Sequence, residues 1–316
     1  MNANILVETD GLSREEWLRY RKQGIGGSDV AAILGISKWN SAISLWLNKT
    51  NQTEDDTQEN EAMEWGTIME PVIRNHFAKV TGKTVVEVHA MLQHPEYPFM
   101  LADIDGLTED EDGNPAILEI KTASEYKRSE WEDVVPTYYQ TQIRHYLTVT
   151  GVKKAYVAVL IGGNAFRVYE VDADEEIQQM LIAVEKEFWN KVQNMIRPSM
   201  DGSDASKNLL DNIYHGGIED EIILPDDAVE WVDAYFEASV EEDNAKAKKQ
   251  DAANHIKEFM GDYDKAKCYD HSISWKKVTS ERLDTKALKE NEPELYQKYV
   301  KLSLIHISEP TRQEAI

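Results

Sequence analysis

The chain has 316 residues, 41% of them hydrophobic and 29% charged, so it is long enough to bury one large core or two modest ones. Its single cysteine, Cys268, excludes a disulfide framework, an iron–sulfur cluster and a cysteine-based zinc site. The formal net charge of −24 argues against indiscriminate nucleic-acid binding, but the acidic excess lies mainly in residues 51–64 and 201–262, which leaves room for a DNA-binding face nearer the N-terminus.

The N-terminal part of the chain predicts two helices separated by glycines. Ser13 opens the first with a capping-box pattern, and the helix runs to about Arg21 before the glycine-rich segment 24–27 interrupts it. A second, short helix is predicted over residues 30–34, just after Ser28. Ser28 is either an ordinary N-cap or, with Arg21, part of an anion site, because a helix N-terminus offers free N–H groups to phosphate. The two explanations do not exclude each other.

A third helix is predicted over 41–48, followed by a polar, acidic loop over 50–60. A longer helix begins at Glu61 and is followed by a strand near 84–89. Apolar residues at helical spacing predict a broad apolar stripe on this longer helix: Met63, Ile68, Val72, Ile73, Phe77 and Val80. A glutamate in mid-helix ordinarily faces water, but Glu70 borders the stripe and is placed to reach carboxylates on neighbouring strands.

Two adjacent predicted strands carry charges where a core is expected. Alternation along the first strand directs Asp103 and Asp105 to the same side. In the second, which follows a turn at 109–114, Glu119 and Lys121 share one face, opposite the apolar residues between them. Two carboxylates and an ammonium group are therefore expected side by side. Asp103 has no role that the sequence assigns.

A Glu and a Lys two residues apart are ordinarily a solvated pair of little energetic value. The addition of Asp105 on a largely apolar neighbouring strand favours a functional explanation. Carboxylate oxygens hold hard divalent cations, which make hydroxide from water and offset charge on a phosphate, and a lysine beside the cation orients the water. Asp105, Glu119 and Lys121 therefore indicate a phosphodiesterase metal site.

The next helix is predicted over 137–150, where Gln142 and Tyr146 share a face at the i, i+4 spacing. A hairpin with strands at 154–161 and 166–171 follows, and then an amphipathic helix from Asp174 to about Met195. The order of these elements predicts a mixed α/β domain. Beyond it, a helix over 226–260, a strand pair at 266–270 and 273–278, and a helix over 284–299 are expected.

The motifs, taken in order, resemble the PD-(D/E)XK nuclease superfamily and, within it, the phage YqaJ-type recombinase exonucleases, relatives of lambda exonuclease. The resemblance covers most of residues 14–195. The residues that carry it are Gly24-Ile-Gly-Gly-Ser-Asp-Val-Ala-Ala-Ile-Leu-Gly, Trp65-Gly-Thr-Ile-Met-Glu70, Asp105-Gly-Leu, Glu119-Ile-Lys121, and Gln142 nine residues before Gly151. It implies an α/β, restriction-endonuclease-like core, with a mixed central sheet flanked by helices, and a C-terminal α+β extension.

The resemblance also implies roles for individual residues at the metal. Asp105 and Glu119 would bind Mg2+, or Mn2+ in its place, with the backbone carbonyl of Ile120 as a further ligand. Glu70 would assist at the metal or its water. Lys121 would position or activate the attacking water, and Gln142 would orient the lysine.

A second set of implied roles concerns the DNA end. Arg21 and Ser28 match residues that hold the 5'-phosphate, and Arg144, which stands where relatives often carry a second Gln, is assigned to phosphate contact. A terminal phosphate held at a fixed distance from the metal would place the first phosphodiester for attack. The implied activity is 5'-to-3' exonuclease digestion of linear double-stranded DNA, which leaves 3' single-stranded overhangs for recombination by strand annealing.

Two alternatives remain: a structure-specific endonuclease of the same superfamily, and a non-catalytic module that binds DNA ends. The implied partners are double-stranded DNA ends, a single-strand annealing protein of the RecT or Bet type, and further copies of the chain, by resemblance in a trimer. No apolar run approaches a membrane span and no signal-peptide pattern is present, so we expect the cytoplasm of a bacterial host cell, with a phage or prophage origin.

The predicted domain organisation has four parts. The nuclease domain occupies 1–198, an acidic linker 199–225, and a helical and hairpin extension 226–301. The remaining residues, 302–316, resemble the translation of a transposase sequencing adaptor and are left out of the fold prediction.

Overall fold

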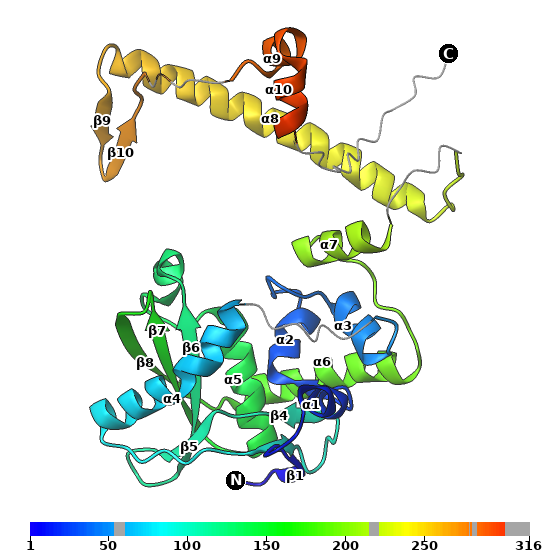
Figure 1. Cartoon of the computed structure of the whole chain (residues 1–316), viewed down its shortest axis with the longest axis vertical. Helices are drawn as coiled ribbons and strands as arrows, with labels where there is room; N and C mark the ends of the chain where they lie inside the picture. Colours follow the sequence, from blue (N-terminus) through cyan, green and yellow to red (C-terminus); the bar gives the residue numbers. More distant parts are fainter. Residues whose placement is uncertain (54–60, 215–220, 278, 280–282, 301–316) are drawn as a thin grey trace. The chain divides into compact units, whose positions relative to one another are not determined.

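The computed structural model divides the chain into two units, Met1–Tyr214 and His215–Ile316 (Figure 1). It describes residues 1–53, 61–214, 221–277, 279 and 283–300. The adaptor-like segment 302–316 lies outside the described residues.

The first unit contains two four-stranded sheets, with helices before, between and after their strands. One sheet has the order β1 (Asn4–Glu8), β3 (Ala90–Gln93), β4 (Met100–Ala102) and β2 (Ile25–Gly26). The other has the order β5 (Gly106–Glu109), β6 (Pro115–Ala123), β7 (Lys154–Ile161) and β8 (Ala165–Asp172). The helices are α1 (Arg14–Arg21), α2 (Gly27–Ile33), α3 (Ala42–Lys49), α4 (Glu61–Thr81), α5 (Thr137–Thr150), α6 (Glu175–Gln193), α7 (Asp204–Ile213) and the 3-10 helix η1 (Glu125–Trp131).

The strand that carries Glu119 and Lys121 is β6, inside the second sheet. It pairs in parallel with β7 along eight registered positions and antiparallel with the shorter β5. The β5–β6 turn closes as predicted: the Asp110 carboxylate accepts the amide of Asp112 at 2.9 Å, and Gly113 takes a φ of 81°.

The prediction of one continuous strand that carries both Asp103 and Asp105 is wrong. β4 and β5 belong to different sheets, and Asp103 and Asp105 lie in the break between them. The expected alternation fails because Met100, Leu101 and Ala102 are all buried, so β4 has no solvent face. The predicted strand at 84–89 is also wrong: only Val86 forms a bridge there, to Leu107.

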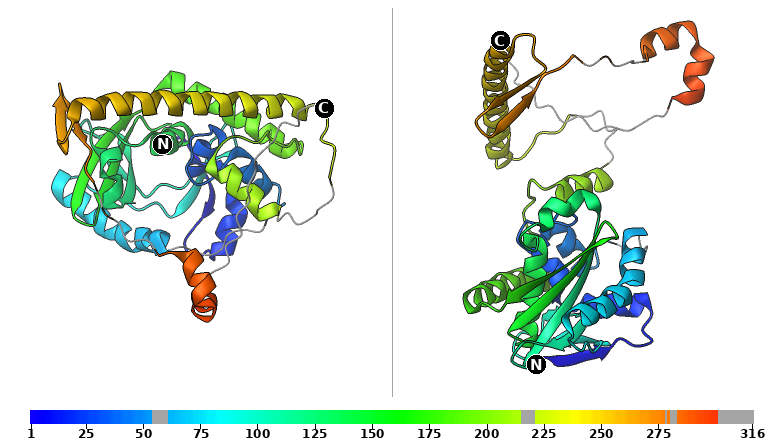
Figure 2. Two further views of the ribbon diagram at one scale, coloured as in Figure 1. Left: turned by 90° about the horizontal axis from the view of Figure 1, so that it is seen from above. Right: turned by 90° about the vertical axis from the view of Figure 1, so that its left-hand side faces the viewer.

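Helices cover both faces of the sheet at β6 and β7 (Figures 1 and 2). On one face, Phe77 of α4 packs with Leu118 and Ile120. On the other, Ile143 of α5 packs in the same cluster as Ile117. Odd-numbered side chains of β6 therefore point to the α5 side, and this places Glu119 and Lys121 there.

Only part of the predicted apolar stripe on α4 is buried. Ile73 and Phe77 reach the core, whereas the other four members of the stripe are about half exposed: Met63, Ile68, Val72 and Val80. The contact of α4 with the sheet is therefore concentrated at Ile73 and Phe77, one turn apart, and the buried stripe is narrower than the one predicted. The predicted helices at α1, α5 and α6 are confirmed within a residue or two, including the Ser13 capping box and the left-handed Gly151 that ends α5.

The first unit extends past the predicted boundary at residue 198. The segment predicted as the start of a linker contains α7, whose Ala205 and Ser206 are buried. Leu209 of α7 packs against the cluster that holds Trp46 of α3. The helix was missed because its apolar positions are few and its neighbours are acidic.

The second unit consists of helices and a hairpin that are almost fully exposed in the part described. It contains α8 (Ala228–Met260), β9 (Lys265–Cys268), β10 (His271–Ser274), α9 (Thr285–Asn291) and α10 (Pro293–Tyr299). The predicted single helix over 284–299 is two helices, because Pro293 begins a new one. Of the helices in the described residues, α8 included, none has the length and apolar composition that a membrane crossing needs.

A buried ion pair ties α5 to α6 and to β4. His145 Nδ1 lies 2.9 Å from Glu185 Oε1, and its Nε2 lies 2.8 Å from the Leu101 carbonyl oxygen. Burial raises the pKa of Glu185. Burial alone would lower the pKa of His145, but the Glu185 carboxylate outweighs it and the pKa is raised. Both ring nitrogens face acceptors, so the pair must retain a proton.

This pair predicts that the folded state loses stability as pH rises. Above the ordinary histidine pKa of 6.5, the unfolded chain gives up a proton that folded His145 keeps. The free energy of unfolding should therefore fall by about 1.4 kcal/mol per pH unit from this pair, until the folded pKa is passed. Urea unfolding of the wild type and of Glu185→Gln across pH 6–9 measures this pH dependence of the unfolding free energy. The Gln amide can donate to neutral His145, so the difference in unfolding free energy between the two proteins should change with pH. If the two plots of unfolding free energy against pH were parallel, the prediction would be contradicted.

Candidate active site

A cavity of about 910 Å3 opens in front of β6, between α4 and α5. It contains most of the charged residues that the sequence singled out, together with aromatic side chains from several elements. Its charged and amide-bearing walls are Glu70, Asp103, Asp105, Glu119, Lys121, Lys127 and Gln142. Its aromatic walls are Trp39, Trp65, Trp131, Tyr138, Tyr139 and Tyr146.

Asp105 lies where the β5–β6 ladder ends. β5 pairs with β6 only as far as Leu118, and at the next open position the Ile120 amide donates to Asp105 Oδ2 at 2.7 Å. In a strand, the N–H and C=O of one residue point to the same side. The Ile120 carbonyl is therefore directed toward the side on which Asp105 lies.

Glu119 is the centre of a hydrogen-bonded set. Its Oε1 accepts from Lys121 Nζ at 2.6 Å and from Gln142 Nε2 at 2.9 Å. The same Gln142 nitrogen donates to the Tyr146 hydroxyl at 3.0 Å, as the shared helix face predicted. Glu119 is 1% exposed, and its second oxygen, Oε2, has no hydrogen-bond partner among the described residues. A buried carboxylate oxygen without a partner is costly unless a ligand completes it.

The carboxylates of the site resist ionisation. Burial and then the charge of Asp105 raise the pKa of Glu119 to about 8. Burial also raises the pKa of Asp105. Burial would lower the pKa of Lys121, but the two carboxylates outweigh this and the pKa is raised. Two buried acids with one ammonium group leave a deficit of positive charge, which a cation would remove.

Glu70 lines the same cavity, yet its carboxylate is engaged by Arg74, four residues later on α4. Burial, and then the charge of Asp105, raises the pKa of Glu70. Arg74 also reaches the Asp105 carbonyl oxygen at 3.4 Å and Glu87 at 2.6 Å. The sequence did not single out Arg74, because its partners are spread along the chain.

The oxygen atoms of the Asp105 carboxylate, the Glu119 carboxylate and the Ile120 carbonyl could serve as ligands to a hard divalent cation. One of them, Glu119 Oε2, is buried without a hydrogen-bond partner among the described residues. A larger cluster is not present: no three His, Cys, Asp or Glu side chains gather to hold a metal within the described ranges. The set that fits is therefore two carboxylates and one carbonyl, with Glu70 turned to Arg74.

A second cavity, of about 120 Å3, lies beside the start of α2 and is lined by Arg21 and Ser28. Arg21 donates to Ser28 Oγ at 2.9 Å and to Asp29 Oδ2 at 2.8 Å. Asp29 also pairs with Lys49 at 2.9 Å. Arg21 and Lys49 thus share the Asp29 carboxylate, and a second acid, Asp103, lines the same cavity and interacts with Arg21. Burial lowers the pKa of Lys49 to about 8, which leaves it charged at neutral pH.

The N-cap explanation of Ser28 is wrong, because α2 begins one residue earlier and the Gly26 amide donates to the Asp29 carboxylate at 3.0 Å. The glycines have a packing role. A Cβ on Gly26 would lie 2.2 Å from the Arg21 guanidinium, and one on Gly27 would lie 2.6 Å from the Tyr146 ring. The glycine-rich segment therefore lets α2 approach both the cation and α5.

The two cavities share a wall made of Asp103 and Tyr146. Asp103 accepts from the Trp17 indole nitrogen at 3.1 Å, and burial raises its pKa. Asp103, to which the sequence assigned no role, thus lies between the cavity lined by Arg21 and Ser28, called the cationic cavity below, and the cavity lined by Asp105 and Glu119, called the carboxylate cavity.

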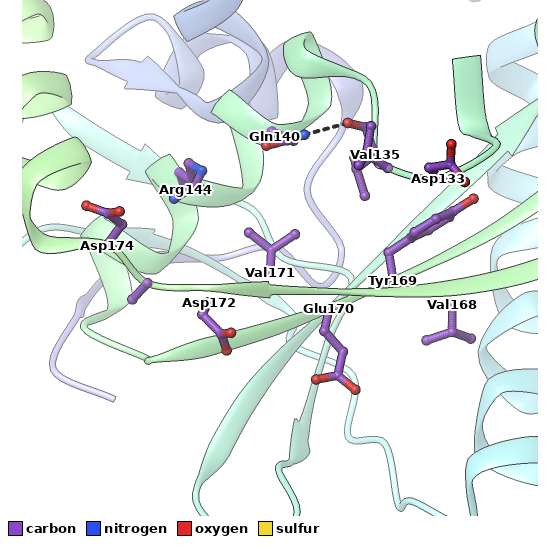
Figure 3. Close-up of a pocket in the computed structure, with 12 residues that line it drawn as sticks. Asp133, Val135, Gln140, Arg144, Val168, Tyr169, Glu170, Val171, Asp172 and Asp174 are labelled. Carbon is purple, nitrogen blue, oxygen red and sulfur yellow. Dashed lines mark hydrogen bonds between the residues drawn. The ribbon is translucent and has the colours of Figure 1, made fainter. Parts of the chain in front are cut away.

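Arg144 does not lie with Arg21 and Ser28. It lines a separate cavity of about 590 Å3 between α5 and β8, whose lining also includes Gln140 and Tyr169 (Figure 3). The predicted contact of Arg144 with the same phosphate is therefore not supported by its position. Helical geometry explains why: two residues after Gln142 is about 200° around the helix.

The order of strands and helices around these side chains defines a mixed α/β domain whose sheets are flanked by helices. Residues 16–153 match the model of the YqaJ-like viral recombinase domain. The chain is 38% identical to protein YqaJ of Bacillus subtilis (strain 168) over 304 residues, which cover 95% of this chain and 94% of that protein. The chain therefore belongs to the YqaJ-like viral recombinase family.

The similarity of this chain to solved structures is more remote. An alkaline exonuclease (LHK-Exo) from Laribacter hongkongensis is 20% identical, with a TM-score of 0.46, and the match covers 63% of this chain and 100% of that one. A phage-related exonuclease from Haemophilus somnus 129PT is 10% identical, with a TM-score of 0.39, over 55% of this chain and 96% of that one.

Proposed function

We propose that this protein is a metal-dependent 5'-to-3' exonuclease that digests one strand of linear double-stranded DNA and leaves a 3' single-stranded overhang. The observation that carries the proposal is the Glu119 carboxylate beside Asp105, which accepts hydrogen bonds from both Lys121 and Gln142. A buried carboxylate oxygen without a partner, next to a lysine and a second acid, supports a site for a cation that assists phosphodiester hydrolysis.

Asp105, Glu119 and the Ile120 carbonyl would hold Mg2+, with Mn2+ as a substitute. When bound, the cation would lower the pKa of a water molecule and offset charge on the scissile phosphate. Lys121 would hold the attacking water or the phosphate oxygen through its ammonium group. Gln142 fixes Glu119 and, through it, the position of the lysine.

The direction of digestion rests on the cationic cavity. The Arg21 guanidinium and the Ser28 hydroxyl both line this cavity, so an added phosphate would meet a cation and a hydrogen-bond donor there. The cavity borders the carboxylate cavity at Asp103 and Tyr146. A terminal 5'-phosphate bound there would present a nearby phosphodiester to Lys121.

Digestion of three substrates tests the proposal: a linear duplex with 5'-phosphates, the same duplex with 5'-hydroxyl ends, and a closed circular duplex. We expect the phosphorylated duplex to be digested fastest in Mg2+, with no digestion in EDTA and none of the circle. Cutting of the circle would indicate a structure-specific endonuclease instead. Absence of hydrolysis with both Mg2+ and Mn2+ would indicate a module that binds DNA ends without catalysis.

Replacing Arg21 by Gln should remove the preference for a 5'-phosphate. A charged hydrogen bond to phosphate contributes enough that the phosphorylated duplex should be digested about ten- to a hundredfold more slowly, to near the rate of the hydroxyl-ended duplex. Initial rates on the two linear duplexes measure this. Arg19→Gln is the matched control, because Arg19 is an exposed residue of the same helix that does not line the cavity. An unchanged preference in Arg21→Gln would refute the assignment.

The overhang would be the substrate of a single-strand annealing protein of the RecT or Bet type, acting in the cytoplasm of the bacterial host. A ring of several copies, such as a trimer, would keep the enzyme on its DNA. Co-purification with an annealing protein and the mass of the protein in solution test these two proposals separately.

A further inference from the structure

Trp39 stands at the edge of the carboxylate cavity with much of its ring exposed. It lies in the segment between α2 and α3 and is 58% exposed, although it lines the cavity. Because the ring both lines the cavity and stays exposed, its free surface is available to a ligand that enters the cavity.

The Trp39 ring has a rigid aromatic support. It meets Tyr138 edge to face, with centroids 5.1 Å apart and planes at 85°, and Tyr139 at 6.3 Å. The Tyr138 hydroxyl donates to Glu130 at 2.8 Å, which fixes that ring in place. A ring held in this way loses little conformational entropy when a ligand binds.

Ammonium groups lie over the same aromatic rings. Lys127 Nζ is 5.2 Å from the centre of the Trp39 ring, and Lys38 Nζ is 5.1 Å from that of Tyr138. Lys38 is also paired with Glu130 at 2.8 Å. A flat apolar surface flanked by lysines is suited to a nucleotide, whose base stacks and whose phosphate is anionic.

The aromatic surface continues to the site of the proposed chemistry. Tyr139, which neighbours Trp39, lies under Lys121 Nζ at 5.1 Å from its ring centre. A strand whose phosphate is at Lys121 would therefore have neighbouring bases within reach of Trp39.

We propose that Trp39 stacks on an unpaired base of the substrate DNA, with Lys127 and Lys38 near the adjoining phosphates. A base inside a duplex has both faces covered by its neighbours, so a base other than the terminal one can offer a face to the indole only after it leaves the stack. The inference rests on the proposed nuclease function and adds to it that the end of the duplex is opened at the cavity. The site thereby takes a single strand rather than an intact helix.

The test uses the full chain in EDTA, so that binding is measured without cleavage. The probe is a 5'-phosphorylated duplex with two unpaired nucleotides at that end, one of them 2-aminopurine. Stacking on Trp39 should quench the fluorescence of the 2-aminopurine in the wild type and in Trp39→Phe. Trp39→Ala should lose most of the quenching and bind about tenfold more weakly.

Tyr126→Ala is the matched control, since Tyr126 is a fully exposed aromatic residue of neighbouring η1 that does not line the cavity. It should behave as the wild type. Circular dichroism and thermal unfolding establish that Trp39→Ala is folded. Equal quenching and affinity in Trp39→Ala and the wild type would overturn the inference.

Cleavage measured separately in Mg2+ distinguishes this inference from the proposed function. A wild type that digests linear duplexes, with quenching independent of Trp39, would refute only the stacking. A wild type that binds the probe through Trp39 but hydrolyses nothing in Mg2+ or Mn2+ would refute only the nuclease.

Discussion

Lys121→Met is expected to lower the rate of linear duplex digestion by about a thousandfold or more. The substitution keeps most of the aliphatic stem and removes the ammonium group that contacts Glu119 at 2.6 Å and lies over Tyr139. A group that acts on the developing charge contributes about this much to catalysis. Single-turnover rates in Mg2+ on a 5'-phosphorylated duplex measure the loss.

Glu119→Gln should lose activity to a similar extent without loss of stability. The carboxylate is buried and its pKa is raised to about 8, so a neutral amide of the same shape relieves an unfavourable charge. Lys79→Met is the control, because Lys79 is an exposed lysine of α4 outside the cavity. Activity within tenfold of the wild type in either site variant would sink the assignment of this site.

Gly27→Ala is expected to damage both stability and activity. The new Cβ would lie 2.6 Å from Tyr146 Cε1 and 2.8 Å from Gln142 Cγ, so α2 and α5 must move apart. Overpacking of this kind costs about 1–3 kcal/mol of unfolding free energy. It should also displace Gln142 from Glu119, with a drop in kcat of about ten- to a hundredfold.

Gly66→Ala is the matched control for that change. Gly66 also lies in a helix beside the cavity, but the nearest atom to its added Cβ is Thr122 Oγ1 at 4.0 Å. Alanine in a helix interior should raise the free energy of unfolding by about 1 kcal/mol. Urea unfolding of both variants and of the wild type gives the comparison. Equal stability of Gly27→Ala and Gly66→Ala would contradict the close approach of α2 to α5.

The parts of the site that follow from local periodicity could be predicted from the sequence. Strand alternation put Glu119 and Lys121 on one face, and helical spacing put Gln142 with Tyr146. Both regularities act over a few residues and are independent of the rest of the chain. The resemblance assigned Arg144 to the same phosphate as Arg21 and Ser28, but Arg144 lies about 200° around α5 from Gln142 and lines a different cavity.

What could not be predicted are partners that meet through the tertiary fold. Lys49 reaches Asp29 across 20 residues, and Arg74 reaches the Asp105 carbonyl across 31. Neither pairing leaves a periodic signal. The break between β4 and β5 was hidden for a different reason: a run of three apolar residues is compatible with a strand buried on both faces as well as with an alternating one.

The ending of the β5–β6 ladder has a consequence for association between chains. Beyond Leu118, no described strand pairs with β6 on the side that β5 leaves, so the sheet has an open edge in the middle of the domain. Open edges invite strands from other molecules, and charges that point inward discourage such pairing. The Asp105 carboxylate accepts a hydrogen bond from the Ile120 amide, and Lys121 adds a charge nearby. The residues proposed for catalysis thus also protect this edge from aggregation, and neutralising several of them together is expected to make the protein less soluble.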